Sequence, residues 1–318
     1  MSYADRVFVS MCKDILSSGT DTKGEAVRPH WEDGTSAYTI KKFGVVNRYN
    51  LRTEFPILTL RKTPIKTAVK EMLWIWQQKS NNINDLDAHI WDSWADKSGS
   101  IGKAYGYQIG QRYGHHRIKP FSNRSSLEYD KKEYPSLMFV SESGIDGTIS
   151  TYATMDQIDS VIWDLKHNPF SRRIMTNIYN FKDLKDMNLY PCAYSCTFNV
   201  TNDKRDDGKL TLNMILNQRS QDVLAANAFN VVQYAVLLHM IAQVCGMVPG
   251  EFVHVIADCH IYDRHVDIIK ELISRESYPA PNFWLNPEIK NFYDFTVDDV
   301  HLEDYKCGNQ IKNIPVAI

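Results

Sequence analysis

The longest apolar stretch of the chain, residues 229–248, constrains the fold more than any other segment. Four polar side chains interrupt it: Asn230, Gln233, His239 and Gln243. Such groups are costly in lipid, so we expect a buried helix of a globular protein and not a membrane span. Gly246 marks the expected end of this helix.

Composition restricts the class of protein. The chain has 318 residues, with 36 Lys and Arg against 38 Asp and Glu, and 43% hydrophobic residues. This apolar fraction and balanced charge exclude a disordered chain. A net charge of −2 leaves no global basic field. We therefore expect no bulk binding of nucleic acid and no need for nucleic acid in the activity, although a few placed arginines can still bind an anionic small molecule.

Cysteine usage and the N-terminus indicate a reduced, cytoplasmic protein without a membrane segment. The first residues lack the basic start and apolar run of a signal peptide. No two cysteines have C-x-x-C spacing and no histidine cluster lies beside them, so neither a metal site nor a disulfide framework is expected. The cysteines are Cys12, Cys192, Cys196, Cys245, Cys259 and Cys307.

Periodicity predicts one α+β domain over residues 1–318, since there are no internal repeats and no Pro-rich linker. Thr63 and Pro64 are expected to begin a helix as cap and first residue, and Thr154 and Gln157 have capping-box spacing before another. Further helices are expected at 3–16 and 265–273, a loop at 17–36, a turn at 206–208, and strands at 38–51, 174–180, 192–202, 210–218 and 251–259.

Residues 112–151 have a different character. They are rich in Ser, Lys, Tyr and Gly and show no clear period. A long segment of this kind within a compact domain is typical of an appended insertion, so we expect an insertion without regular structure here.

Four short motifs could carry chemistry. Cys192 follows Pro191 at the start of an expected strand, where it is either a nucleophile or a small buried residue. Residues 218–222 place a cation, a hydroxyl and a carboxylate together, which suits a phosphate but equally suits a capped helix start. Arg172 and Arg173 point to opposite sides if extended, as in a solvated pair or an interface. His260 and Tyr262 would share one face of a strand and could contact a sugar.

The order and combination of nine motifs resemble the folate-dependent thymidylate synthase family. The resemblance covers almost the whole chain except residues 112–151, and implies a large mixed sheet covered by helices, with two such sheets packed back to back in a homodimer. The motifs are KEMLW at 70–74, IWDSW at 90–94, AYG at 104–106, SRR at 171–173, PC at 191–192, QRSQD at 218–222, AFN at 228–230, DCHIY at 258–262 and PVAI at 315–318.

The resemblance implies a methyltransferase of dTMP biosynthesis. It would transfer a one-carbon unit from 5,10-methylenetetrahydrofolate to C5 of dUMP, giving dihydrofolate, with no metal. Cys192 matches the nucleophile that adds to C6, and nearby arginine charge would favour its thiolate. The other residues that match the catalytic set are Glu71, Tyr105, Arg219 and Asn230.

The expected dUMP site takes residues from two subunits. Arg172 and Arg173 would reach the phosphate from the partner of an obligate homodimer, which removes the geometric difficulty of two adjacent arginines. Asn230 can accept from N3–H and donate to O4 of uracil, the reverse of what cytosine needs. From the same chain the site would take Arg28, Gln218, Arg219, Ser220, Asp222, His260 and Tyr262.

The folate site is expected to include Trp91, Trp94, Asp222 and the C-terminal tail with Ala317, which would close over the ligands and exclude water. The sequence departs from the family pattern at Ala193, Ala226, Ala228 and Ala257.

Two other functions stay open at this point. A dUMP hydroxymethylase would use the same Cys192 and Asn230, and a non-catalytic nucleotide-binding homologue would keep the fold.

Overall fold

The computed structural model describes residues 1–115, 131, 133–144, 147–202 and 208–317. The helices are α1 (Tyr3–Ser18), α2 (Ile65–Trp76), α3 (Gly106–Ile109), α5 (Gln157–His167), α6 (Asn227–Val244) and α7 (Val266–Leu272). The strands are β1 (Thr20–Asp21), β2 (Thr39–Asn50), β3 (Tyr113–His115), β4 (Met138–Ser143), β5 (Ile149–Met155), β6 (Met175–Asn177), β7 (Ala193–Thr201), β8 (Thr211–Asp222), β9 (Val248–Tyr262), β10 (Asn282–Leu285) and β11 (Val300–Glu303).

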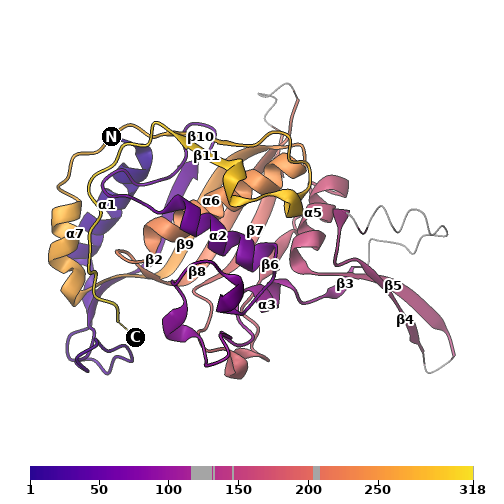
Figure 1. The fold of residues 1–318 in the computed structure, drawn as a ribbon, viewed down its shortest axis with the longest axis horizontal. Helices are drawn as coiled ribbons and strands as arrows, with labels where there is room; N and C mark the ends of the chain where they lie inside the picture. Colours follow the sequence, from indigo (N-terminus) through magenta and orange to yellow (C-terminus); the bar gives the residue numbers. More distant parts are fainter. Residues whose placement is uncertain (116–130, 132, 145–146, 203–207, 318) are drawn as a thin grey trace.

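A six-stranded mixed sheet organises the molecule, in the order β1-β2-β9-β8-β7-β6 (Figure 1). The β8–β9 pair is parallel and the other pairs are antiparallel. The parallel pair is joined by α6, which packs against both strands, while α1 packs against β2 and β9. The expected α+β class, a single domain with a large mixed sheet covered by helices, is confirmed.

Helix α6 is the buried helix that the apolar stretch predicts. Fourteen of its eighteen residues are buried, so it is apolar nearly all round. It begins at Asn227, two residues before the apolar run, and Gly246 follows its end with a φ of 68°. The Gln243 side chain donates to the backbone carbonyls of Asn286 and Ile289, which satisfies its amide within the protein.

Two predicted helix caps are wrong. Helix α2 begins at Ile65, and Thr63 caps no helical N–H; its own N–H donates to the Tyr305 hydroxyl. At α5 the capping side chain is Asp156, which accepts from the N–H of Asp159. Thr154 belongs to β5 instead. Thr63 instead makes a tertiary hydrogen bond to Tyr305, and Thr154 pairs within a β-sheet. These interactions replace the local caps that the motifs predict.

Residues 112–151 contain more structure than expected. Their described parts form β3, β4 and the first three residues of β5, which belong to a three-stranded sheet in the order β3-β5-β4 that projects from the body (Figure 1). Tyr134 and Leu137 are buried, and the Ser136 hydroxyl donates to the Asp159 carboxylate at 2.6 Å. The expected absence of regular structure is therefore wrong for the described residues. Residues 206 and 207 of the predicted turn lie outside them.

Register places the functional motifs together. Strand β8 does not end at Gln218 but continues to Asp222, because Ser220 pairs with Asp258 and Asp222 with His260 on β9. On its other side, Gln218 pairs with Ala193 of β7. The 192, 218–222 and 258–262 motifs thus meet at one end of three adjacent strands.

Candidate active site

Cys192 lies just before β7, half-buried, and its backbone is held from two sides. Its N–H donates to the Tyr105 hydroxyl at 3.2 Å, and its carbonyl accepts from the Arg219 N–H at 2.9 Å. The Arg219 Nη2 atom is 3.8 Å from the sulfur. The structure therefore brings the thiol and a cation together, as expected.

Arg219 also fixes the loop before the cysteine. Its Nε donates to the Pro191 carbonyl at 3.0 Å and its Nη2 to the Tyr190 carbonyl at 2.8 Å. A planar guanidinium with two such bonds has a defined orientation, so the charge has a fixed place beside the sulfur.

Burial and charge act in opposite directions on the thiol. Burial raises the pKa of Cys192, whereas the charges of Arg219 and Arg28 lower it, and burial has the larger effect. The arginine charges expected to favour the thiolate are present, but the effect of burial is larger.

The loop with Arg28 is anchored next to the end of β9. The Trp31 indole N–H donates to Asp263 at 3.1 Å, and its ring packs edge-on against Tyr262 at 5.5 Å. Arg28 itself is exposed. Arg172 and Arg173 are also exposed, in the segment between α5 and β6 at the far edge of the sheet. Within one chain the structure does not bring them to Cys192.

His260 and Tyr262 adjoin at the end of β9, with ring centroids 5.0 Å apart. The His260 Nδ1 atom is 2.7 Å from the Asp258 carboxylate, which only accepts hydrogen bonds when ionised. Nδ1 therefore carries a hydrogen, and in the neutral ring Nε2 is left as an acceptor. A sugar hydroxyl could donate to that nitrogen.

A chain of buried amides links this strand to α2. The His254 Nε2 atom is 2.8 Å from Gln218 Oε1, and Gln218 donates to Asn230 Oδ1 at 3.3 Å. Asn230 Nδ2 donates to Gln233 at 3.1 Å, and Gln233 donates to Glu71 at 2.7 Å. Asn230 lies inside α6 and is not its N-cap. Its amide orientation is fixed by this chain, with the half-buried side chain partly accessible.

Glu71 lies at the end of the amide chain on α2. Its other carboxylate oxygen accepts from the Trp91 indole N–H at 2.7 Å. Burial raises the pKa of Glu71 to about 7, although the bonds from Trp91 and Gln233 act to lower it. A carboxyl group with this pKa can both give and take a proton near neutral pH.

Tyr105 has a strained backbone and a buried ring. Its φ is +45°, and the following Gly106 admits no side chain, since a Cβ there would lie 2.1 Å from the Ser80 carbonyl oxygen. The ring packs edge-on against Trp91 at 4.9 Å. Burial raises the pKa of the Tyr105 hydroxyl, so it remains protonated beside Cys192.

The residues expected to bind folate lie beside Tyr105, at the turn before α6 and in the C-terminal tail. Trp91 is buried, and the half-buried Trp94 packs edge-on against it at 5.7 Å. Asp222 Oδ1 accepts from the N–H groups of Leu224 and Ala225 at 2.9 and 3.0 Å, which fixes the turn before α6. Ala317 is half-buried in the tail.

The chain is similar to known proteins over its full length. Residues 6–318 match the family described as thymidylate synthase. Thymidylate synthase of Bacillus licheniformis is 41% identical over 98% of each chain, and thymidylate synthase 1 of Bacillus subtilis (strain 168) is 40% identical over the same shares. The solved structure of thermostable thymidylate synthase A from Bacillus subtilis matches with a TM-score of 0.80 at 39% identity, covering 100% of both chains.

The chain belongs to the thymidylate synthase family.

Three site residues were not predicted from the sequence. Gln233 lies one helical turn from Asn230, so its spacing within the apolar stretch was a usable signal. Arg61 is buried and its Nη2 donates to the Leu224 carbonyl, beside Asp222. His265 contacts both Asp222 and the tail. Nothing local in the sequence distinguishes Arg61 or His265 from surface cations.

The departures from the family pattern fall close to the site. Ala193 is buried in β7, and Ala226 precedes α6 without a side-chain cap. Ala228 is buried in the first turn of α6, while Ala257 is half-buried in β9.

Among the described residues, no group of three His, Cys, Asp or Glu could hold a metal ion. No helix in the described ranges is long and apolar enough to cross a bilayer.

Proposed function

We propose that this protein is a thymidylate synthase that methylates dUMP to dTMP and converts 5,10-methylenetetrahydrofolate to dihydrofolate. The observation that carries the proposal is the pairing of Cys192 and Arg219 next to the hydrogen-bonded chain from Asn230 to Glu71. This combination offers a nucleophile, a reader for the base and a proton carrier in one place.

Cys192 is the proposed nucleophile. Its sulfur adds to C6 of the uracil, which makes C5 electron-rich enough to take the one-carbon unit. Phosphate bound beside Arg219 would orient the substrate at the sulfur. The Tyr105 hydroxyl, which accepts from the Cys192 N–H, holds the loop in position and can take part in proton removal from C5. The folate supplies both the carbon and the hydride.

Asn230 is the proposed reader of the base. Its oxygen already accepts from Gln218 and its nitrogen already donates to Gln233, so the two ends are fixed as acceptor and donor. Uracil needs this arrangement for N3–H and O4, and cytosine needs the opposite. Glu71, connected through Gln233, is proposed to move protons at the base and at the folate.

The remaining contacts follow from placement. His260 and Tyr262 are proposed to bind the deoxyribose, with Gln218 and Ser220 beside the base and the phosphate. Trp91, Trp94 and Asp222 are proposed to hold the folate, and the tail with Ala317 to cover it. We also propose a cytoplasmic location.

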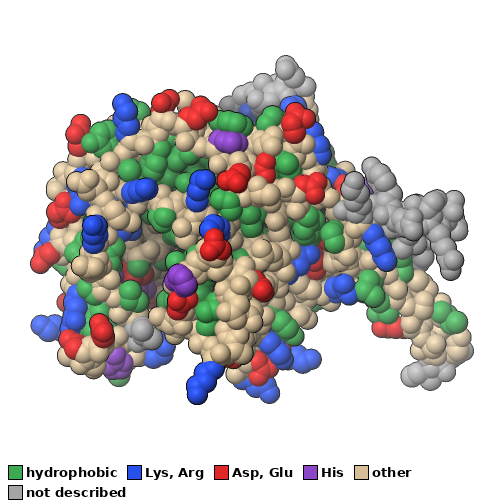
Figure 2. All heavy atoms as spheres, viewed as in Figure 1, with side chains coloured by type: hydrophobic (Ala, Val, Ile, Leu, Met, Phe, Trp, Pro, Cys, Tyr) green, Lys and Arg blue, Asp and Glu red, His purple; other side chains and the backbone are tan. Residues whose placement is uncertain are grey.

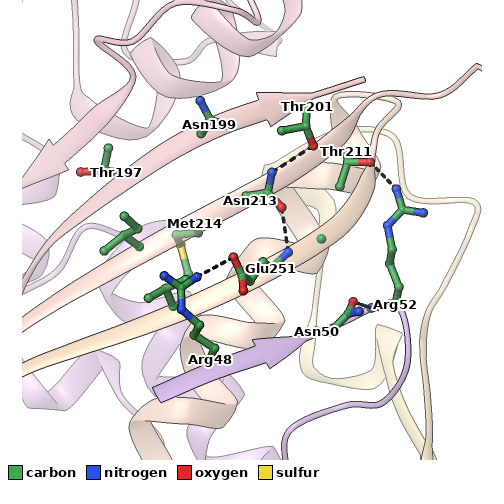
Figure 3. A pocket seen from close by; sticks show the side chains of 13 residues that line it. Arg48, Asn50, Arg52, Thr197, Asn199, Thr201, Thr211, Asn213, Met214 and Glu251 are labelled. Atoms are coloured by element: carbon green, nitrogen blue, oxygen red, sulfur yellow. Dashed lines mark hydrogen bonds and ion pairs between the residues drawn. The ribbon is translucent and has the colours of Figure 1, made fainter. Parts of the chain in front are cut away.

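A homodimer is proposed to complete the phosphate site. One sheet face is open in the single chain: Met175, Ile215 and Val46 are 50%, 40% and 51% exposed, on the strands β6, β8 and β2. Figure 3 shows a hollow on this face, where Arg48 pairs with Glu251 at 2.9 Å. Apolar side chains on an uncovered sheet favour packing against a second copy. Arg172 and Arg173 would then reach the partner's phosphate site.

The described residues on the face seen in Figure 2 do not form a basic surface. Figure 2 shows Lys and Arg side chains interspersed with Asp and Glu over the visible face. A nucleic-acid-binding protein would be expected to gather its cations in one stripe or patch.

The proposal is tested by mixing the protein with dUMP and 5,10-methylenetetrahydrofolate. We expect the absorbance of dihydrofolate to rise and mass spectrometry to detect dTMP in equal amount. Hydroxymethylated product without dihydrofolate would indicate a dUMP hydroxymethylase. Nucleotide binding without product would indicate a binding protein. Either result would contradict the proposal.

A further inference from the structure

His265 lies where four segments of the proposed site meet. It is the last residue of a 3-10 turn (Asp263–His265) and is fully buried. Its ring packs edge-on against Trp31 at 5.7 Å and Tyr262 at 5.6 Å. Nε2 is 2.8 Å from the Pro315 carbonyl oxygen of the tail, and Nδ1 is 3.7 Å from the Asp222 carboxylate.

Hydrogen-bond chemistry defines what the ring can do. A carbonyl oxygen only accepts, so Nε2 must carry a hydrogen to bond with Pro315. In a neutral ring Nδ1 then presents a lone pair to the Asp222 carboxylate, which also only accepts when ionised. Nδ1 is buried and has no hydrogen-bond partner within 3.5 Å. Only the imidazolium, with a hydrogen on both nitrogens, suits both neighbours at once.

We propose that His265 acts as a buried imidazolium and a positioning residue that ties the C-terminal tail to Asp222, so that tail closure and folate binding are coupled. The inference rests on the proposed function for the roles of Asp222 and the tail. His265 itself touches neither the reacting atoms nor the proposed base-binding residues.

Charges around the ring favour this state. Burial lowers the pKa of His265, but Asp222, the Pro315 carbonyl and Asp263 together raise it above its ordinary value. The pKa of Asp222 is lowered although burial opposes this, because His265 and His260 act on it. The titratable and charged groups on the neighbouring elements are Asp222 on β8, His260 and Tyr262 on β9, Asp263 and Arg264 on the turn, Asp33 on the loop with Trp31, and Arg61 before α2.

A pH dependence follows with a definite sign. As pH rises through the pKa of His265, the ring keeps one N–H and can serve only one of its two acceptors. Either the tail or Asp222 then loses its contact. We expect weaker folate binding and a looser tail at high pH, while the affinity for dUMP alone stays nearly constant.

Two substitutions separate the two contacts. The amide nitrogen of Gln overlays Nε2 of histidine, so His265→Gln keeps a donor for Pro315 and removes the one facing Asp222. The amide of Asn overlays Nδ1, so His265→Asn keeps a donor for Asp222 and removes the one to the tail. His301→Gln is a matched control, because His301 stacks on Trp284 on the β10–β11 pair, away from the site.

The readouts are the KM for 5,10-methylenetetrahydrofolate between pH 6 and 9 and the rate at which carboxypeptidase releases residues 316–318. For His265→Gln we expect a KM raised about fivefold or more and independent of pH, with wild-type tail release. For His265→Asn we expect tail release faster by about fivefold or more. The affinity for dUMP should not change in either variant, and His301→Gln should match the wild type throughout.

Wild-type tail release and folate KM in both His265 variants, with the wild-type pH dependence, would overturn the proposal. If the variants do not fold, tail release from the wild type across the same pH range decides, normalised to a free peptide of residues 304–318. A flat profile would equally overturn it. A wild-type protein that makes no dTMP would instead contradict the proposed function. The rate of tail release would still test the contact between His265 and Pro315.

Discussion

Glu71 and Cys192 are ionisable groups for which burial is the largest influence on the pKa, and it raises both values. They differ in what opposes burial. Cys192 has the charges of Arg219 and Arg28 near it, whereas Glu71 has only neutral donors from Trp91 and Gln233. A neutral donor stabilises a carboxylate less than a full charge does, so Glu71 keeps a pKa near neutrality and is suited to proton transfer.

The first prediction concerns the rate. Glu71→Gln keeps the size of the side chain but cannot take a proton, so we expect kcat to fall about 100-fold or more. The affinity for dUMP measured in the absence of folate should change little. Steady-state kinetics and a binding titration check the two parts, and an unchanged kcat would remove Glu71 from the proton-transfer role.

The second prediction concerns stability. The pKa of Glu71 is raised in the folded state from 4.5 to about 7. The favourable contribution of Glu71 to the free energy of unfolding is therefore complete below pH 4.5 and is lost as pH rises to about 7. The difference between the two pKa values corresponds to about 3 kcal/mol of this free energy. Between pH 5 and 8 we expect the wild type to lose stability relative to Glu71→Gln in urea unfolding. Parallel pH profiles for the two proteins would contradict the assignment.

The third prediction concerns specificity. Asn230→Asp removes the donor that faces O4 of uracil and offers acceptors that suit the amino group of cytosine. We expect the ratio of kcat/KM for dUMP over dCMP to fall by about 10- to 100-fold. Ala228→Gly, two residues earlier on the same helix, serves as the control and should keep the ratio. An unchanged ratio in Asn230→Asp would exclude Asn230 as the reader of the base.

Site residues could be predicted from the sequence where they belong to a short motif of recognisable residue types and spacing. Cys192, Arg219 and Asn230 belong to compact motifs, and the structure places them together. Arg61 and His265 are single residues whose importance comes from a partner far away in the chain, such as Leu224 or Pro315. No local pattern records such a pairing.

At the scale of elements, the parallel β8–β9 pair and the helix between them assemble the site. The register pairs Asp222 with His260, and α6 presents Asn230 and Gln233 one turn apart to the same network. Hydrophobic periodicity predicted these elements well because each buries one face or the whole segment. The caps were predicted less well, since Thr63 and Thr154 are used by Tyr305 and by β5.

We propose that residues 112–151 are an insertion whose outer part is dispensable. The outer described residues, 141–144 and 147–151, are all exposed, and Ile149 is 73% exposed. They bury little surface against the body of the protein. The inner residues are different, because Leu137 is 2% exposed and Ser136 bonds to Asp159.

The fourth prediction follows from this division. Replacing residues 140–150 by a short turn should leave kcat near the wild-type value and the unfolding midpoint nearly unchanged. Leu137→Ala creates a cavity at the base of the same segment and should cost about 2–4 kcal/mol. Chemical unfolding of both variants checks this, and a trimmed protein as unstable as Leu137→Ala would show that the outer part supports the fold.

At the scale of the whole molecule, the proposed phosphate site takes residues from two chains. Arg219 and Arg28 act on Cys192 within one chain. Arg172 and Arg173 are exposed, just before the edge strand β6. The open sheet face supplies a surface for a second copy. A dimer of this kind shares two sites between its subunits, so each subunit can repair a defect in the other.

The fifth prediction uses this sharing. Cys192→Ser and the double variant Arg172→Ala, Arg173→Ala should each be nearly inactive. After the two are mixed, unfolded and refolded together, half of the dimers should be hybrids with one intact site. We therefore expect about a quarter of wild-type activity. Activity no higher than that of the separate variants would contradict shared sites.

The measurement that tests the central claim most directly is covalent capture by 5-fluoro-dUMP with 5,10-methylenetetrahydrofolate. Fluorine at C5 prevents proton loss, so a sulfur added at C6 should remain attached. We predict that mass spectrometry of the digested protein finds nucleotide and folate together on the peptide with Cys192. Cys192→Ser should give none. A wild-type protein without the adduct, or with the adduct on another cysteine, would contradict the account.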